Sequence, residues 1–471
     1  MHFEVKGKYN MPMLIVILMT AFITTFTGSA LNLSVPSISS EFHAGAVSVG
    51  WIVTGYILAS AALSVPFGRF ADLYGKRPVF LAGVSIFTVC CFLCTLSQSI
   101  GMVIAFRLIQ GVGAAMIFAT NIATLVAIYP HEKRGAMLGL STAFTYLGLS
   151  LGPVIGGFLN AQFSWRSIFI ATTVYDIIMT MIAIFVFKPP QPGLEKRAMR
   201  KLMDIPGCFL YTASLVLIMY GFSSIMSNTA AKLMLPTGII LLIIFIRHEL
   251  SADSPVINMK LFTGSRMFCL SNLAALLNYG ASYAVSYLLS IYLQSVQGFS
   301  SSAAGLILIT SPVFQTILSP LMGKLSDRIA PYKLASAGMA LTAVGIFMFV
   351  FTTQQLHILF ILAALSIIGI GFALFSSPNT NAVMGCVDKK NYSVASSILA
   401  TSRSIGHTVS MAIVSSVVAV TVGNITLASA SDESIVSAMR VSFIIFTVLC
   451  TAGVFCSMCR REVSIGCGTD K

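Results

Sequence analysis

Long apolar segments recur along this 471-residue chain from Met11 to Met458. A helix needs roughly 20 mostly apolar residues to cross a bilayer, whereas strands of a membrane barrel are shorter and alternate in polarity. Only 9% of the residues are charged, too few to cover a soluble globule, in which about 25% are charged. We therefore predict an all-α polytopic membrane protein with fourteen transmembrane helices, at residues 12–36, 47–67, 78–97, 101–128, 136–160, 166–187, 205–226, 233–248, 267–294, 302–322, 334–352, 356–377, 394–423 and 437–458.

Basic residues are distributed unevenly between the two sides of this predicted bundle. Of the 28 Lys and Arg residues, 23 lie at the amino terminus, in the loops after even-numbered spans or in the tail. Cytoplasmic loops retain basic residues, so we expect a multi-pass protein of the cell membrane with both termini in the cytoplasm. This orientation beside an anionic leaflet explains the net charge of +13 without nucleic acid as a partner.

Two charged turns stand out in this apolar chain. GRFADLYGKRP begins at Gly68, and GKLSDRIAPYK begins at Gly323. When spans 7 and 8 are treated as an insert, each turn follows the second span of a six-span half, and each glycine precedes an acid by four residues. Glycine permits close helix approach, and the acid can cap a helix or pair with arginine. Two similar halves around a shared site are typical of secondary transporters. The simpler alternative is a polar turn that only retains positive charge inside.

The first turn resembles the G-x-x-x-D-x-x-G-[KR]-[KR] loop of the major facilitator superfamily, and the second is similar to a degraded copy with Ala330 and Pro331 at the expected glycine and basic positions. RLIQGVGAA from Arg107 resembles the superfamily's R-x-x-Q-G-x-G-A pattern, and GLSLGPVIGG is similar to a signature of exporting antiporters. SPVINMKLF and YLQSVQGFSSSAAGL resemble stretches of the fourteen-span drug:proton antiporter branch. The resemblance implies two six-helix bundles, 1–187 and 266–471, joined by 188–265 with two extra helices.

The resemblance also implies roles for the residues that match these patterns. The charged turns would form a cytoplasmic latch from Gly68, Asp72, Gly75, Lys76, Arg77, Arg134, Gly323, Asp327 and Arg328. Glycines repeated every four residues in span 5 would let helices approach closely. We expect them to form a tightly packed seam between the two halves, with Gly148, Gly152, Pro153, Gly156 and Gly157 as the packing residues.

Candidates for proton coupling are few, because the acid that this branch usually carries in its first span is replaced by Thr27. Of the fifteen acids, Asp176 is the one well inside a predicted span, roughly 16 Å from Trp165 at ~1.5 Å per residue. A buried guanidinium must face protein or water, and the resemblance implicates Arg107 in proton coupling. His407 could titrate near neutral pH. For each of these residues, a purely structural role is the alternative.

The scarcity of membrane acids favours neutral or anionic substrates over cationic ones. Tyr279, Tyr283 and Tyr287 recur every four residues, so they could stack a planar ring, although such a stripe can also serve helix packing. The candidate substrate-binding residues are Asn32, Gln110, Asn121, Asn278, Tyr279, Tyr283, Asn379, Asn381 and Arg403.

Two functions fit these observations. The first is proton-coupled efflux of amphipathic organic compounds, and the second is movement of one nutrient or metabolite, for example uptake of a planar vitamin such as riboflavin. The predicted cytoplasmic loops are too short for a catalytic domain, and we find no H-E-x-x-H, P-loop or dinucleotide signature. We therefore expect a monomeric transporter rather than an enzyme, with a small organic substrate, protons and the lipid bilayer as partners and no cofactor or metal.

Overall fold

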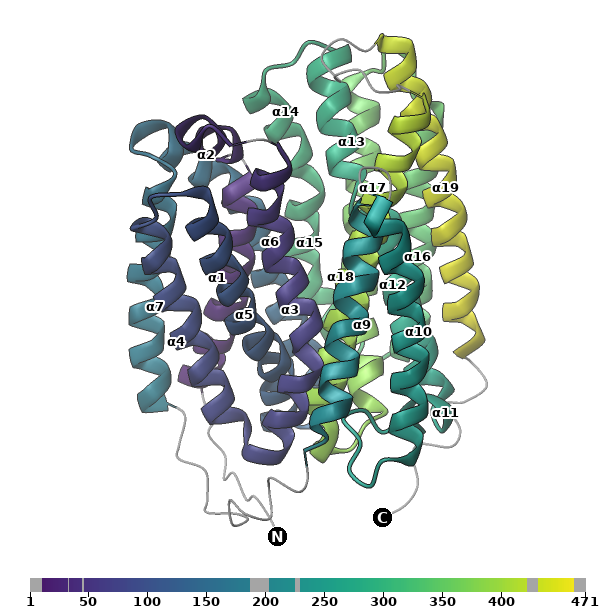
Figure 1. The fold of residues 1–471 in the computed structure, drawn as a ribbon. Coiled ribbons are helices and arrows are strands. Elements are labelled where there is room, and N and C mark those ends of the chain that lie inside the picture. Colours follow the sequence, from purple (N-terminus) through teal and green to yellow (C-terminus); the bar gives the residue numbers. More distant parts are fainter. Residues whose placement is uncertain are drawn as a thin grey trace.

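A computed structural model describes residues 11–32, 34–44, 46–186, 203–224, 229–421 and 431–460. Helices make up the regular structure of these residues (Figure 1). They are α1 (Met11–Asn32), α2 (Val35–Phe42), α3 (Ala46–Tyr74), α4 (Lys76–Thr95), α5 (Ile100–Ile128), α6 (His131–Gln162), α7 (Arg166–Val186), α9 (Ile205–Ser224), α10 (Thr229–Ser251), α11 (Lys260–Thr263), α12 (Arg266–Ser282), α13 (Val285–Ile291), α14 (Ser301–Leu308), α15 (Thr310–Leu325), α16 (Pro331–Met348), α17 (Ile358–Gly385), α18 (Tyr392–Thr421) and α19 (Asp432–Met458). Short turns η1 (Tyr292–Val296), η2 (Phe349–Phe351) and η3 (Lys389–Asn391) join them.

The helices form two groups, which we call the N-half and the C-half. In the N-half, α1 packs on α6 and α7, and α5 packs on α3 and α4. In the C-half, α17 packs on α15 and α16, and α12 packs on α18 and α19. Figure 1 shows the two groups side by side, with α19 running from the top of the view toward its lower part; the end drawn lowest is here called the lower end.

Serine side chains define where several of these helices begin. The Ser99 hydroxyl accepts the Met102 N–H at 3.3 Å before α5, and the Ser265 hydroxyl accepts the Phe268 N–H at 3.2 Å before α12. The first N–H groups of a helix have no partner within it, so such caps fix the ends of otherwise apolar segments.

Thirteen helices among the described residues are long and apolar enough to cross a membrane. The predicted ninth span, 267–294, is not one helix, because the chain breaks between α12 and α13. There the Ala284 N–H donates to the Ser410 hydroxyl of α18 at 3.0 Å. The two pieces together make the fourteenth crossing. The first span is also shorter than predicted, since α1 ends at Asn32 rather than at residue 36.

The inserted pair, α9 and α10, contacts both halves. On the N-half side, the Thr212 hydroxyl donates to the Ala62 carbonyl at 3.4 Å, and the Tyr220 ring stacks on Trp51. On the C-half side, the Tyr211 hydroxyl donates to the Thr401 hydroxyl of α18 at 3.3 Å. The insert therefore bridges α3 and α18.

The glycine stripe of α6 packs in a different place from the one we predicted. Gly148, Gly152 and Gly156 face α1, so close that a Cβ on Gly156 would meet Ala30. Because α1 and α6 belong to the same half, the expected seam between halves is wrong. The close glycine contact between halves lies lower on α6, where Gly139 meets Gly323 of α15.

This packing predicts that Gly152→Ala destabilises the protein, because the added methyl group would collide with Ser29 and Ala30. Overpacking of this kind costs about 1–3 kcal/mol. The matched control is Gly28→Ala, since a Cβ at Gly28 would have no atom within 4 Å. Thermal unfolding of the purified protein in detergent should show a lower midpoint for Gly152→Ala only. Equal midpoints for the two variants would contradict the packing.

Candidate functional site

At the lower end, each half caps a helix of the other half with an aspartate. The Asp72 carboxylate of α3 accepts the N–H groups of Ser393 and Val394, at the start of α18, at 3.1 and 3.0 Å. The Asp327 carboxylate, just after α15, accepts the N–H groups of Gly135 and Ala136, near the start of α6, at 2.6 and 2.9 Å. A helix N-terminus carries partial positive charge, so both contacts are charge-assisted. We call this pair of contacts the reciprocal caps.

Glycine makes the reciprocal caps possible. A Cβ on Gly68 would lie 2.8 Å from the Ser393 carbonyl oxygen, and one on Gly323 would collide with Gly135 and Gly139. Any side chain at either glycine would push the two halves apart. The two turns therefore hold α3 against α18 and α15 against α6 by the same device.

The basic residues predicted for the latch have different surroundings. Lys76 lies 3.5 Å from Asp72, and the Arg134 guanidinium lies over the Tyr392 ring of the opposite half at 5.6 Å. Arg77 donates to the Ile184 carbonyl of α7 at 3.4 Å, within its own half, and Arg328 is exposed. Gly75 has φ of 102°, a conformation that favours glycine, and it turns the chain from α3 into α4.

An aromatic and basic cluster joins the halves farther from the lower end. The Tyr279 ring of α12 contacts Phe372 of α17, His407 of α18 and the Arg403 guanidinium, at 5.3, 5.4 and 5.5 Å. From the N-half, Tyr146 of α6 packs on Phe372 at 6.4 Å and interacts with Tyr279 and Ser376. No spacing in the sequence distinguishes Tyr146 from other tyrosines, so sequence analysis missed it. We call these residues, with Tyr283, the central cluster.

Tyr283 and His407 form a stacked pair within the central cluster. Their rings lie 4.0 Å apart at 20°, and 40% of the Tyr283 surface is exposed. Arg403 donates to the Thr380 hydroxyl at 2.9 Å, its Nε has no partner among the described residues, and no acid there lies within 4 Å of it. The cluster thus presents a flat aromatic surface next to a cation without a counter-ion.

The predicted asparagines do not gather at this cluster. Asn121 donates to the Ile17 carbonyl between α5 and α1, and Asn381 donates to the Ser326 hydroxyl beside Asp327. Asn379 is held by Arg460, and Asn278 is fully buried with no partner for its amide among the described residues. The Asn32 side chain lies outside the described residues.

Arg460, which the topology count placed in the tail, lies just after α19 but is not exposed. Its side chain is fully buried at the end of α19 and donates to the Ser271 hydroxyl and to Asn379 Oδ1, both at 2.8 Å. Burial lowers the pKa of Arg460 to about 10, so the guanidinium stays protonated at neutral pH.

A second buried polar cluster lies inside the N-half. Arg107 is fully buried, donates to the Ile52 carbonyl at 3.1 Å and to Gln110 Oε1 at 2.6 Å, and lies over the Tyr56 ring at 4.2 Å. Gln110 in turn donates to the Cys91 sulfur at 2.7 Å. The cluster joins α3, α4 and α5, and it leaves Gln110 away from the central cluster.

Asp176 of α7 borders this buried cluster. Its side chain is 1% exposed, its Oδ2 has no partner among the described residues, and it interacts electrostatically with Tyr56 and Cys91. Asp176 and Arg107 are not within 4 Å, so they form no direct ion pair. Thr27, at the position where an acid was expected, donates to the Ile23 carbonyl.

Comparison with known proteins agrees with this architecture. The family model of the Major Facilitator Superfamily matches residues 17–266 and 271–464. The chain belongs to the major facilitator superfamily. Members of this family move solutes across membranes, so this multi-pass membrane protein is a transporter rather than an enzyme.

Relatives within the family have different named substrates. The chain is 29% identical to the riboflavin transporter RibZ of Clostridioides difficile, over 87% of this chain and 88% of the relative. It is 29% identical to the multidrug resistance protein Stp of Mycobacterium tuberculosis, over 83% and 72% of the two chains. Its fold is similar to that of the human organic anion transporter MFSD10, with a TM-score of 0.65 at 14% identity over 94% and 100% of the chains.

The reciprocal caps predict that Asp72→Ala loosens the lower end, because two N–H groups of α18 would lose their acceptor. A buried helix cap contributes about 0.5–2 kcal/mol, which corresponds to a several-fold shift between closed and open populations. The distance between spin labels placed on α3 and α18 near the lower end, measured by double electron–electron resonance, should be longer in Asp72→Ala than in the wild type. Asp388→Asn is the control, since its side chain is 77% exposed. An unchanged distance in Asp72→Ala would show that the cap does not hold the halves together.

Proposed function

We propose that this transporter exports amphipathic organic compounds from the cytoplasm in exchange for protons, as a monomer in the cell membrane with both termini in the cytoplasm. The observation that carries this proposal is the reciprocal caps, which hold the two halves together at the lower end. The lower end carries most of the basic loop residues, so we assign it to the cytoplasm. The conformation is then closed toward the cytoplasm, and export requires the caps to open for substrate loading.

The central cluster supports the proposal as the place where substrate binds. Its residues come from both halves, so its surroundings change whenever the halves move relative to each other. Alternating access needs a site with this property. Resemblance to the exporter signature and relation to a multidrug resistance protein favour the outward direction.

The buried N-half cluster supports the proton-coupling part of the proposal. A carboxyl group in an apolar interior is far more stable neutral than charged, so Asp176 would bind and release its proton only when water or a cation approaches. Arg107 and Asp176 both interact with Tyr56 and Cys91, and the charge of Arg107 would help to release that proton.

Asp176→Asn tests this assignment. The amide fills the same volume but cannot release a proton, so transport driven by an imposed pH gradient in proteoliposomes should fall at least about tenfold. Transport of a fluorescent amphipathic dye down its own gradient should persist. Asp388→Asn again serves as the control. Undiminished gradient-driven transport in Asp176→Asn would remove this acid from the coupling mechanism.

A second candidate function is uptake of a planar vitamin. The Tyr283–His407 stack lies beside Arg403, which has no acidic partner within 4 Å in the described part of the chain, and this arrangement suits a flat ring that carries carbonyl or anionic groups. A riboflavin transporter is among the relatives. This candidate differs from export in direction, so it can be tested directly.

Uptake of labelled riboflavin separates the two candidates. Cells that express the protein should accumulate the vitamin in proportion to expression if uptake is correct, and they should not if export is correct.

A ring substitution tests the stacking surface whichever direction is correct. We expect Tyr283→Ala to weaken transport of a planar compound by about tenfold, because stacking contributes about 0.5–1.5 kcal/mol beyond area burial. Tyr283→Phe keeps the ring, so it should retain transport. Similar rates for Tyr283→Ala and Tyr283→Phe would exclude ring stacking at this site.

A further inference from the structure

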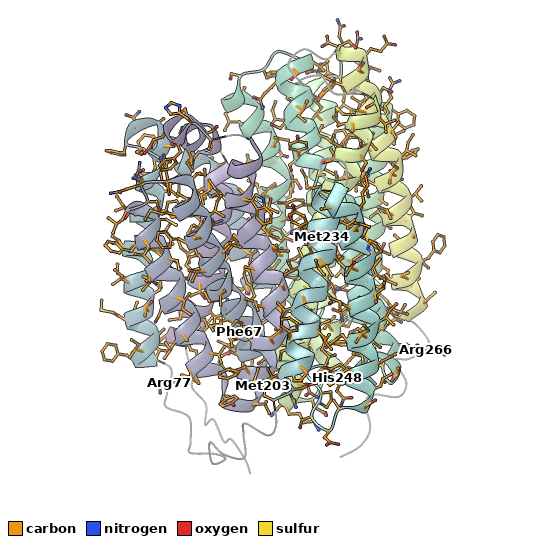
Figure 2. The ribbon with its side chains drawn as sticks, viewed as in Figure 1. Phe67, Arg77, Met203, Met234, His248 and Arg266 are labelled. Carbon is orange, nitrogen blue, oxygen red and sulfur yellow. The ribbon has the colours of Figure 1, made fainter. Side chains whose placement is uncertain are left out.

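Two carboxyl groups meet in the inserted helix pair, far from both clusters described above. Asp204 stands before α9, where its Oδ1 accepts the Gly207 N–H at 2.9 Å and its Oδ2 contacts His248 Nε2 at 2.8 Å. Figure 2 shows His248 at the lower end. A Cβ on Gly207 would collide with both Asp204 Oδ2 and Glu249 Oε1, so both oxygens lie close to the Gly207 α-carbon. The two carboxyl groups also interact electrostatically.

Glu249 is buried with half of its carboxyl group unpartnered. Its side chain is 3% exposed near the end of α10, and its Oε2 accepts the Ile257 N–H at 3.0 Å. Its Oε1 has no partner among the described residues. A charged carboxylate there would face the Asp204 carboxylate with no basic side chain of the described residues within 4 Å of it. A single proton on Oε1 would instead make Glu249 a donor toward Asp204.

The charged surroundings of this pair come from three helices. On α10, His248 contacts Asp204, and on α9, Cys208 interacts with both acids. From α3, Arg69 interacts with Cys208 rather than forming an ion pair with either acid within 4 Å. His248 therefore contacts Asp204, whereas Glu249 has no basic side chain of the described residues within 4 Å. One of the two carboxyl groups thus lacks a positive partner, which favours a proton on Glu249.

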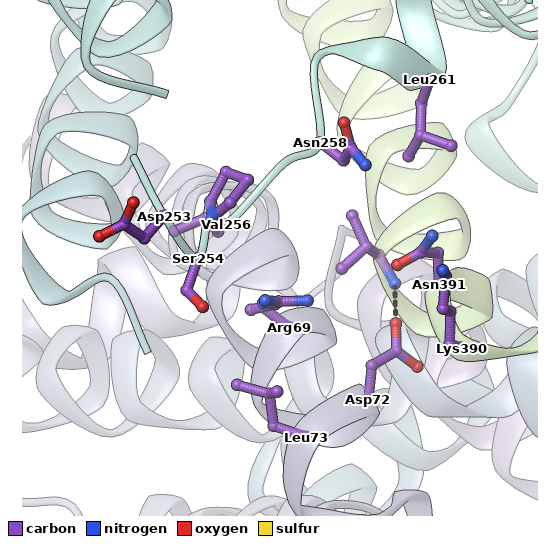
Figure 3. A pocket seen from close by; sticks show the side chains of 12 residues that line it. Arg69, Asp72, Leu73, Asp253, Ser254, Val256, Asn258, Leu261, Lys390 and Asn391 are labelled. Atoms are coloured by element: carbon purple, nitrogen blue, oxygen red, sulfur yellow. Dashed lines mark hydrogen bonds between the residues drawn. The ribbon is translucent and has the colours of Figure 1, made fainter. Parts of the chain in front are cut away.

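The segment that Glu249 holds lies beside the Asp72 cap. Residues 253–256 and Asn258 line a pocket together with Arg69, Asp72 and Leu73 of α3 (Figure 3). The same pocket is lined by Lys390, Asn391 and Val394, at the start of α18. In Figure 3 the dashed line from Asp72 to the Val394 N–H borders this pocket. Thus the Ile257 N–H connects Glu249 to the segment beside the Asp72 cap.

We propose that the Glu249–Asp204 pair is a proton-binding site of the insert, and that its proton keeps residues 253–258 docked beside the Asp72 cap. When the proton leaves, the two carboxylates repel each other and Glu249 moves away from Asp204. Residues 253–258, which are hydrogen-bonded to Glu249 Oε2 through the Ile257 N–H, then become more mobile, and the pocket beside the Asp72 cap opens. A rise in cytoplasmic pH would thus loosen, through the insert, the segment packed beside the Asp72 cap.

An apolar carbodiimide tests the proton site, because it modifies protonated carboxyl groups in apolar surroundings. In the full-length protein in nanodiscs, dicyclohexylcarbodiimide should modify Glu249, as read by peptide mass spectrometry, and the exposed Asp388 should stay unmodified. The rate should fall about tenfold per pH unit once the proton dissociates. Asp204→Asn retains a capping side chain but removes the neighbouring carboxylate, so modification of Glu249 at pH 7 should fall about tenfold. Absence of modification between pH 5 and 8, or an equal rate in Asp204→Asn, would overturn the site.

Hydrogen exchange tests the connection to the cap. Glu249→Gln keeps an acceptor for the Ile257 N–H and cannot become charged. In this variant, loss of a proton therefore cannot change the hydrogen-exchange protection of residues 256–257. We compare the exchange rate of residues 256–257 in the wild type with that in Glu249→Gln. The ratio of wild-type to variant rate should be near one at pH 6. It should rise at least about tenfold above the pH at which carbodiimide modification stops. A ratio that stays flat across this range would show that the proton does not control the segment. Neither measurement depends on transport, so failure here is distinct from failure of the proposed export.

Discussion

The closed end of this transporter depends on two carboxylates that each cap a helix of the opposite half. A helix N-terminus offers N–H groups with no partner within the helix, and an acid from another helix satisfies them at a fixed position. Asp72 does so for two first-turn N–H groups of α18, and Asp327 accepts two N–H groups one turn inside α6, in both cases over glycines that let the backbones touch. Such a contact is strong while aligned and weakens steeply with displacement, so it suits an interface with two discrete states.

Much of the architecture could be predicted from the sequence because it follows from local composition. Span number, family and the equivalent positions of the two charged turns are set by apolar length and by motifs. The break in the ninth span could not be predicted, since the Ala284 N–H there donates to the hydroxyl of Ser410, which is 126 residues away in the chain. Arg460 illustrates the same limit: its burial depends on Ser271 and Asn379, contacts that only the fold brings together.

The candidate site residues show the same difference between contacts that follow from local sequence and contacts that only the fold creates. Arg107 and Gln110 are three residues apart on one helix, so their contact follows from helical spacing. The asparagines were grouped for polarity alone, and the fold separates them because each amide meets whichever carbonyl its helix happens to face. Glu249 was overlooked because an acid at a span end is usually solvated. Its burial depends on the absence of a side chain at Gly207, 42 positions earlier in the chain.

The insert breaks the symmetry that the reciprocal caps share. α9 contacts α3 and α18, the two helices joined by Asp72, whereas α6 and α15, joined by Asp327, have no comparable contact with the described part of the insert. Opening at Asp72 must therefore break or carry along the Tyr211–Thr401 and Thr212–Ala62 contacts, while opening at Asp327 need not. Two chemically similar caps consequently have different costs of opening. A change in the insert can therefore alter the opening of the Asp72 cap directly, because α9 contacts both helices that this cap joins.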